Sequence, residues 1–98
     1  MVNTLQWTDR AIEEYDKLVD YLYEEWGEEI TQRVITEIDQ TLLRIKKSPK
    51  LFPIFIKSRK VRRCVASLQT SIFFKIKPDW IEISSVFDNR QNPKKRNL

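Results

Sequence analysis

The chain contains a single glycine, Gly27, and its position limits what the first half of the sequence can fold into. Apolar residues recur every three or four positions on both sides of it, which is the period of an amphipathic helix. Glycine readily adopts the positive φ that ends a helix. The sequence therefore predicts two helices joined into an antiparallel hairpin. The two stripes are Ala11, Tyr15, Leu18, Leu22 and Trp26, then Ile30, Val34, Ile38, Leu42 and Ile45.

Signals at the ends of these stripes set the boundaries of the predicted helices. Thr8 or Asp9 can cap the first helix, which follows a short strand over residues 3–7. The second helix runs from about residue 29 to 47, and "SPKLFP" ends it because each proline disfavours helix in the residue before it. The helical pair needs a partner surface, since so small a pair buries little by itself.

Three further strand-like runs supply that surface, over residues 60–67, 71–77 and 80–87. The last run alternates, which predicts Ile81, Ile83 and Phe87 on one face of the sheet. Short turns, including Pro78-Asp79, make these three strands an antiparallel meander, and the first strand pairs with one of them. The predicted fold is α+β, in the order β-α-α-β-β-β, with the helical hairpin packed on one face of an antiparallel sheet. Residues 1–93 form one domain and residues 94–98 form a basic tail.

Composition excludes several classes of site and of protein. The chain has no histidine and one cysteine, Cys64, so the usual zinc-ligand clusters and a histidine base are excluded, and no cofactor is expected. No apolar run approaches the length of a membrane span. The N-terminus lacks the basic-then-apolar pattern of a signal peptide, so the expected location is the cytoplasm.

Charge is divided between the two halves of the chain. Residues 1–45 contain 4 basic and 11 acidic residues, whereas residues 46–98 contain 14 basic and 3 acidic residues. A surface polarised in this way attracts phosphate backbones or an acidic protein segment.

Basic residues in and near the last strands are the candidate functional residues. Arginine binds phosphate with a planar fork of donors, so a basic sheet face suits nucleic acid or phosphoryl transfer. The alternative is a solvated edge, because charged edge strands discourage aggregation. Arg62 and Arg63 are adjacent in a strand and point to opposite faces, so one of them lies near the helices and pairs there, for example with an acid. The candidates are Lys57, Arg59, Lys60, Arg62, Arg63, Arg90, Lys94, Lys95 and Arg96, with Asp88 and Asn89 read as turn residues that position Arg90.

An ordered set of short motifs resembles the RelE/ParE toxin superfamily, specifically its plasmid-stabilisation branch. The motifs are "WTDRA", "YLYEEWG", "SPKLFP", "VRR", "TSIFFKI" and "SVFDNRQNP", and they span nearly the whole chain. The resemblance implies a β-α-α-β-β-β toxin of a type II toxin–antitoxin system, neutralised by a cognate antitoxin. It leaves open a homodimer or a toxin–antitoxin hetero-oligomer.

The resemblance implies two different targets. RelE-like members are ribosome-dependent mRNA endonucleases, and their pattern places catalytic cations at Arg62 and Arg90, with Arg63 beside them. Cys64 and Ser71 stand where those nucleases often have a lysine and an arginine, and no tyrosine follows Tyr23. These departures favour the ParE-like side, whose members poison DNA gyrase through protein contact with their C-terminal part. A third alternative is an inactive RNA-binding or structural relic of the family.

Overall fold

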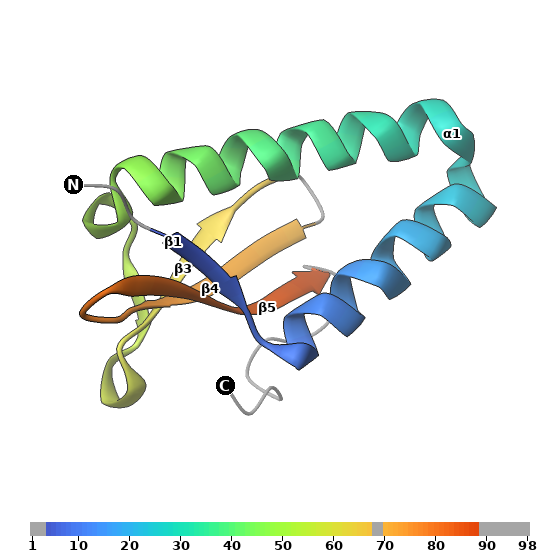
Figure 1. Ribbon diagram of the computed structural model, residues 1–98. Helices are drawn as coiled ribbons and strands as arrows, with labels where there is room; N and C mark the ends of the chain where they lie inside the picture. Colours follow the sequence, from blue (N-terminus) through green and yellow to red (C-terminus); the bar gives the residue numbers. More distant parts are fainter. Residues whose placement is uncertain (1–3, 68–69, 89–98) are drawn as a thin grey trace.

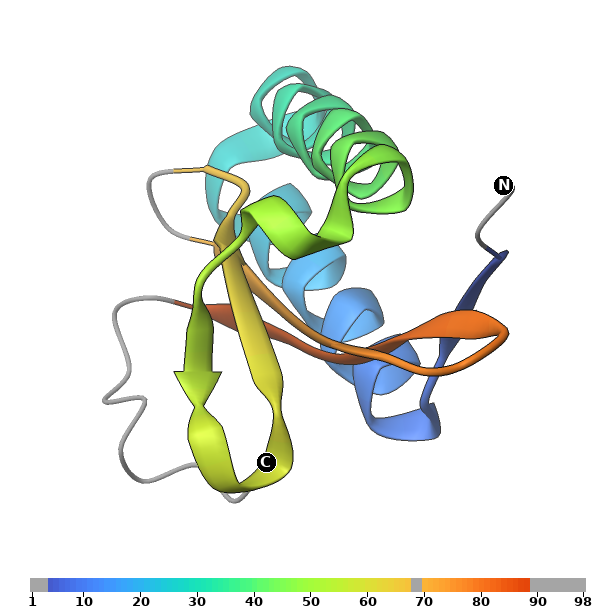
Figure 2. The ribbon, with the colours of Figure 1, turned by 90° about the vertical axis from the view of Figure 1, so that its left-hand side faces the viewer.

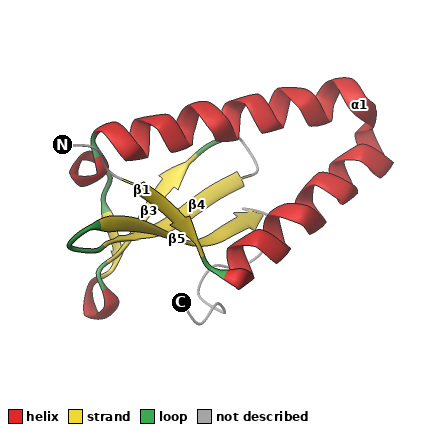
Figure 3. Ribbon diagram, in the orientation of Figure 1, coloured by secondary structure: helices red, strands yellow, loops and turns green. Residues whose placement is uncertain are grey.

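A computed structural model gives the fold and describes residues 4–67 and 70–88. The strands are β1 (Thr4–Trp7), β2 (Ile54–Ile56), β3 (Val61–Val65), β4 (Thr70–Ile76) and β5 (Trp80–Asp88), as shown in Figures 1 and 3. Helix α1 (Asp9–Lys47) follows β1, and two short 3-10 helices, η1 (Pro49–Leu51) and η2 (Lys57–Arg59), flank β2. The predicted α+β class is confirmed.

Helix α1 is broken at Gly27, which has φ 84° and ψ 179°. The two halves of the helix diverge from this point and lead back toward the sheet (Figure 1). Just after the break, the Thr31 hydroxyl donates a hydrogen bond of 2.8 Å to the Gly27 carbonyl. The hairpin predicted from the lone glycine is therefore confirmed.

The sheet has five strands in the order β1-β5-β4-β3-β2. Strands β3, β4 and β5 form the predicted antiparallel meander. The first strand pairs with β5, as Thr4↔Trp80 to Trp7↔Ile83, and this pairing is parallel. The sheet is therefore mixed rather than wholly antiparallel, and the parallel pair is possible because β1 and β5 are joined through the whole intervening chain and not by a short turn.

Both halves of α1 cover the same face of the sheet, which is called the helix face below. Its core contains Ala11 from the first half of the helix and Ile38 and Ile45 from the second, all fully buried. They pack against Cys64, Ile72, Phe74, Ile81 and Ile83 from the strands. Most of the two predicted stripes pack in or against this core, namely Ala11, Tyr15, Leu18, Val34, Ile38, Leu42 and Ile45, whereas Trp26 at the end of the first stripe is 55% exposed.

The opposite face of the sheet, called the second face below, carries a smaller cluster of Val61, Phe73 and Phe87. The sequence predicted Phe87 on the same face as Ile81 and Ile83, and that prediction is wrong. A β-bulge sets Phe73 opposite Ser85 but Phe74 opposite Ile83, which leaves Ser84 as an extra residue. An extra residue reverses the alternation after it, so Phe87 changes face.

Three further features of the strands differ from prediction. Strand β2 was not predicted, because three residues after Pro53 carry too weak a pattern. Strand β3 covers residues 61–65 rather than 60–67, and Lys60 lies in a left-handed turn before it, with φ 55° and ψ 36°. Asp88 is the last residue of β5 rather than a turn residue.

Replacing Gly27 with alanine should lower the free energy of unfolding. The backbone there occupies a region of φ and ψ that is essentially restricted to glycine, so we expect a loss of about 1–3 kcal/mol. No atom lies within 4 Å of the added Cβ, so the loss comes from backbone strain and not from a clash. Urea unfolding followed by circular dichroism measures it.

The matched control is Glu28→Ala, because Glu28 is the next residue and is exposed on the helix. That change should shift the free energy of unfolding by less than about 0.5 kcal/mol. If both variants lost the same free energy of unfolding, an alanine would adopt the backbone conformation of Gly27 without strain, and the prediction would be wrong.

Candidate functional site

The two adjacent arginines of β3 lie on opposite faces of the sheet. Arg62 pairs with Phe74, whose side chain lies in the core of the helix face. Arg63 pairs with Phe73, whose side chain lies in the cluster of the second face. The alternation predicted for this pair is confirmed.

Arg62 binds the backbone of the segment that joins α1 to β2. Its Nη1 donates hydrogen bonds of 2.7 Å to the Phe52 carbonyl and 3.3 Å to the Lys50 carbonyl. An acid was one expected partner for an arginine on this side, whereas Arg62 donates here to two carbonyl oxygens. Arg62 therefore fixes η1 and Phe52 against the sheet.

Arg63 lies among aromatic rings on the second face. Its Nε donates a hydrogen bond of 3.1 Å to the Ser71 hydroxyl, and its guanidinium lies 5.5 Å from the centre of the Phe55 ring. Phe55 in turn packs on Phe73, with ring centres 5.2 Å apart, and Phe73 contacts Phe87 at 5.9 Å. Stacking and hydrogen bonding together hold the Arg63 side chain in one orientation.

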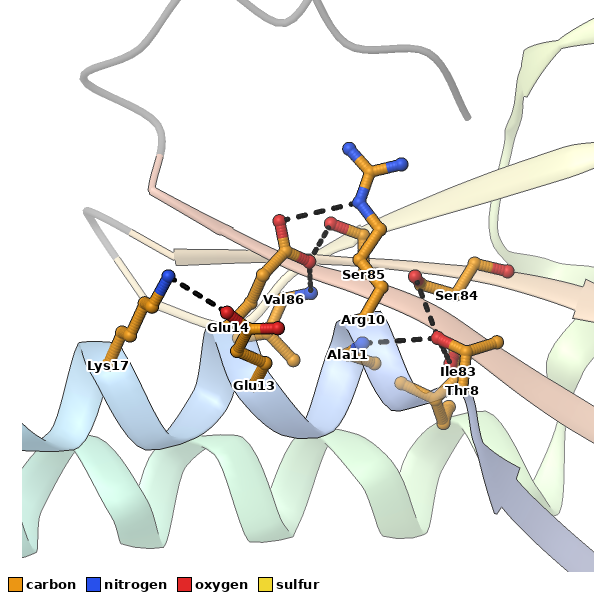
Figure 4. Close-up of polar contacts among 10 residues, drawn as sticks. All are labelled: Thr8, Arg10, Ala11, Glu13, Glu14, Lys17, Ile83, Ser84, Ser85 and Val86. Carbon is orange, nitrogen blue, oxygen red and sulfur yellow. Dashed lines mark hydrogen bonds and ion pairs between the residues drawn. The ribbon is translucent and has the colours of Figure 1, made fainter.

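Glu14 joins the first turns of α1 to Ser85 and Val86 of β5, which follow the residues that pair with β1 (Figure 4). Its Oε1 accepts hydrogen bonds of 2.7 Å from the Ser85 hydroxyl and 3.3 Å from the Val86 amide. Arg10 lies on its other side, with Nε 3.7 Å from Oε2. Because β1 ends opposite Ile83, this carboxylate covers an edge of β5 that no strand among residues 4–67 and 70–88 reaches.

Some of the remaining basic candidates lie between β2 and β3, and the others belong to the part of the chain that the structure does not describe. Lys57, Arg59 and Lys60 are exposed in the connection between β2 and β3. Arg90, Lys94, Lys95 and Arg96 lie outside the described residues, as does the predicted basic tail.

The described residues offer little nucleophilic or metal chemistry. Cys64 is 4% exposed, and burial raises the pKa of its thiol above the ordinary value of 9.0, which the charge of Arg44 only partly offsets. The Ser84 hydroxyl donates a hydrogen bond of 3.2 Å to the carboxylate of Glu82, which holds it in place. Within residues 4–67 and 70–88, no three metal-binding side chains gather. No helix in that part is both long and apolar enough to span a membrane.

Sequence analysis missed residues that shape the edge of β5 and the second face. Neither Glu14 nor Ser85 was singled out from the sequence. Their contact joins residues 71 positions apart, and no local pattern predicts such a pair. Phe55 was missed because β2 was not predicted.

A family model provides the comparison that decides the family. The model that describes the ParE toxin of the type II toxin–antitoxin system ParDE matches residues 5–93. The chain belongs to the ParE toxin family. The predicted superfamily is thereby confirmed, and with it the identification as a toxin of a type II toxin–antitoxin system.

A solved structure supports the fold of this ParE-family chain. It is described as "Chromosomal ParDE TA system from P. aeruginosa" and superposes with a TM-score of 0.74 at 19% sequence identity. The match covers 89% of this chain and 96% of the other. No curated protein matches the sequence. At this level of identity the likeness concerns the fold of the ParE-family toxin and not its target.

Replacing Glu14 with alanine should destabilise the protein. The change removes an acceptor from the fully buried Ser85 hydroxyl and from the Val86 amide, and we expect a loss of about 1–3 kcal/mol in the free energy of unfolding. Its neighbour Glu13 pairs with Lys17 on the exposed side of the helix at 3.0 Å, so Glu13→Ala should cost less than about 0.5 kcal/mol. Urea unfolding of the two variants would contradict the role of Glu14 if their losses were equal.

Alkaline pH should lower the stability of the protein partly through Cys64. Because burial raises the pKa of the thiol in the folded state, the folded protein holds this proton more tightly than the unfolded chain. The resulting stability is complete below the ordinary pKa of 9.0 and is lost as pH rises through the folded value. The free energy of unfolding, measured in urea at increasing pH, should therefore fall less steeply above pH 9.0 in Cys64→Ala than in the wild type.

Burial, with the charges of Asp39 and Asp16, also raises the pKa of Tyr15 above 10.0, so the Cys64→Ala variant should keep a decline at higher pH. Tyr15→Phe is the control that removes this second decline. A Cys64→Ala curve parallel to the wild type throughout would contradict the raised thiol pKa.

Proposed function

We propose that this ParE toxin inhibits growth by binding a cellular target, with DNA gyrase as the first candidate, and that a cognate antitoxin neutralises it. The observation that carries the proposal is the placement of Arg62 and Arg63 on opposite faces of the sheet. The proposal places the toxin in the cytoplasm with its target. It leaves a homodimer and a toxin–antitoxin hetero-oligomer as the two assemblies to test.

Cleavage of mRNA by a 2′-hydroxyl would need cations that converge on one phosphate and a group that activates the hydroxyl. Arg62 donates to two backbone carbonyls on the helix face, so it does not converge with Arg63. The chain has no histidine to act as the base. These features disfavour the ribonuclease alternative, in which Arg62, Arg63 and Arg90 would act together.

Binding to a target needs neither a base nor converging cations. It needs a surface that is held in one shape before contact, because ordering side chains on association lowers affinity. The second face has such order, since Arg63 is held by Ser71 and by the Phe55 ring. The excess of basic residues after residue 45 adds a field that attracts acidic partners.

Two assays with the purified toxin test the proposal. In a supercoiling assay, the wild type should inhibit gyrase or cause it to leave cleaved DNA. In cell-free translation with ribosomes present, primer extension should show intact mRNA. Cuts at ribosome-positioned codons would overturn the proposal in favour of the endonuclease.

A variant of Arg63 distinguishes the mechanisms further. For an endonuclease, Arg63→Ala should abolish cleavage in a folded protein, whereas Leu43→Ala on the exposed side of α1 should not. For the inactive relic, expression of the wild type should cause no growth defect at all. A growth defect with intact mRNA and inhibited gyrase is the result that the proposal expects.

A further inference from the structure

The outer edge of the sheet at β2 has an unusual combination of features. Strand β2 ends the strand order, and within the described residues its one strand neighbour is β3 (Figure 2). An edge strand of this kind can accept an extended segment of another protein as an additional strand. Proteins usually protect such edges with short strands, charge or proline, and here Pro53 and the length of three residues do so only in part.

The edge exposes apolar side chains on both faces of the sheet. Leu51 is 81% exposed, Ile54 is 45% exposed and Phe55 is 38% exposed. Ile54 lies opposite Arg62, whereas Phe55 packs on Phe73 of the second face. A strand added at β2 would therefore meet an apolar side chain whichever way its own side chains point.

Arg62 explains how so exposed a leucine is held in place. Its guanidinium binds the carbonyls of Lys50 and Phe52, which are the residues on either side of Leu51. The Phe52 ring is also anchored, since it packs edge-on against Phe74 with ring centres 5.9 Å apart. The backbone that carries Leu51 is thus fixed before any partner arrives, which lowers the entropy cost of binding.

The chain segments that form and flank this edge carry positive charge. No aspartate or glutamate occurs between Ile45 and Asp79 in the sequence. The last turn of α1 and the two short helices beside β2 are basic, with Lys46, Lys47, Lys50, Lys57, Arg59 and Lys60. An acidic segment is therefore attracted to the edge.

We propose that the β2 edge, formed by Leu51 and Ile54–Ile56, is a docking site for the antitoxin, which binds there through an acidic, extended segment with apolar residues. This inference rests on the proposed function, because it takes the antitoxin as the partner. A nucleic acid fits less well, since the two most exposed apolar side chains of the edge, Leu51 and Ile54, are aliphatic, and the ring of Phe55 is already packed on Phe73. Pro53 has no amide hydrogen, so backbone pairing is limited to β2, and Leu51 supplies an anchor beyond it.

The test uses the antitoxin encoded beside the toxin gene and the double variant Leu51→Asp, Ile54→Asp. Removal of central apolar anchors and addition of like charge should weaken antitoxin binding by at least about 30-fold, measured by calorimetry. The matched control is Leu43→Asp, because Leu43 is 66% exposed on α1, and it should bind as the wild type does. Circular dichroism checks that each variant is folded.

Hydrogen exchange on the wild-type complex gives a readout that no substitution can disturb. The antitoxin should slow exchange at the amides of Ile54–Ile56. Protection confined to other segments, such as the two halves of α1, would overturn the docking site.

The outcomes separate this inference from the proposed function. If the antitoxin neutralises the wild type and the double variant equally, the proposed function stands and the docking site is wrong. If the antitoxin neither binds nor neutralises the wild type, both are wrong. If the double variant loses binding to a single-stranded RNA oligonucleotide but keeps the antitoxin, the edge is a nucleic-acid site and the inference is overturned.

Discussion

The start of α1 is bound to β5, and the rest of the architecture depends on this junction. The Thr8 amide donates a hydrogen bond of 3.1 Å to the Ile83 carbonyl, which extends the pairing of β1 with β5 by one residue. The Thr8 hydroxyl accepts a hydrogen bond from the Ala11 amide and thereby caps the helix. Glu14, on the second turn, binds the next part of β5 through Ser85 and Val86. The first half of α1 is thereby fixed against the sheet, and the break at Gly27 then returns the second half over the same face.

The pleat of β3 gives two adjacent arginines unrelated roles. Arg62 holds the segment of Leu51 against the sheet, whereas Arg63 forms part of an aromatic surface on the second face. In a ParE-family toxin this division suits a protein that works through contact, because each arginine shapes a surface and the two do not meet at one point. A basic motif such as "VRR" can therefore point to a functional surface although only one of its two arginines lies on that surface.

The sequence predicted those parts of the fold that local patterns encode. The helical period on both sides of Gly27 predicted the hairpin, and the alternation of Ile81 and Ile83 predicted a strand against which it packs. The bulge at Ser84 was not predictable in this way, because "EISSVF" fits either register until its pairing with β4 is known. The contact between Glu14 and Ser85 depends on tertiary structure and leaves no local signal. Arg62 was selected as a candidate site residue for its charge, whereas the structure shows it donating to the backbone carbonyls of Lys50 and Phe52.

The parallel pairing of β1 with β5 has a consequence for how the chain is synthesised. The contact of Thr8 with Ser84 joins residues 76 positions apart, so β1 cannot pair with its neighbour in the sheet until β5 has been made. Contacts of such long sequence separation form late in folding, because the intervening chain must first be ordered. A ribosome that stalls before β5 would therefore release a fragment whose helical hairpin has lost part of its core. The cell that makes this toxin therefore meets its folded form only after β5 has been synthesised.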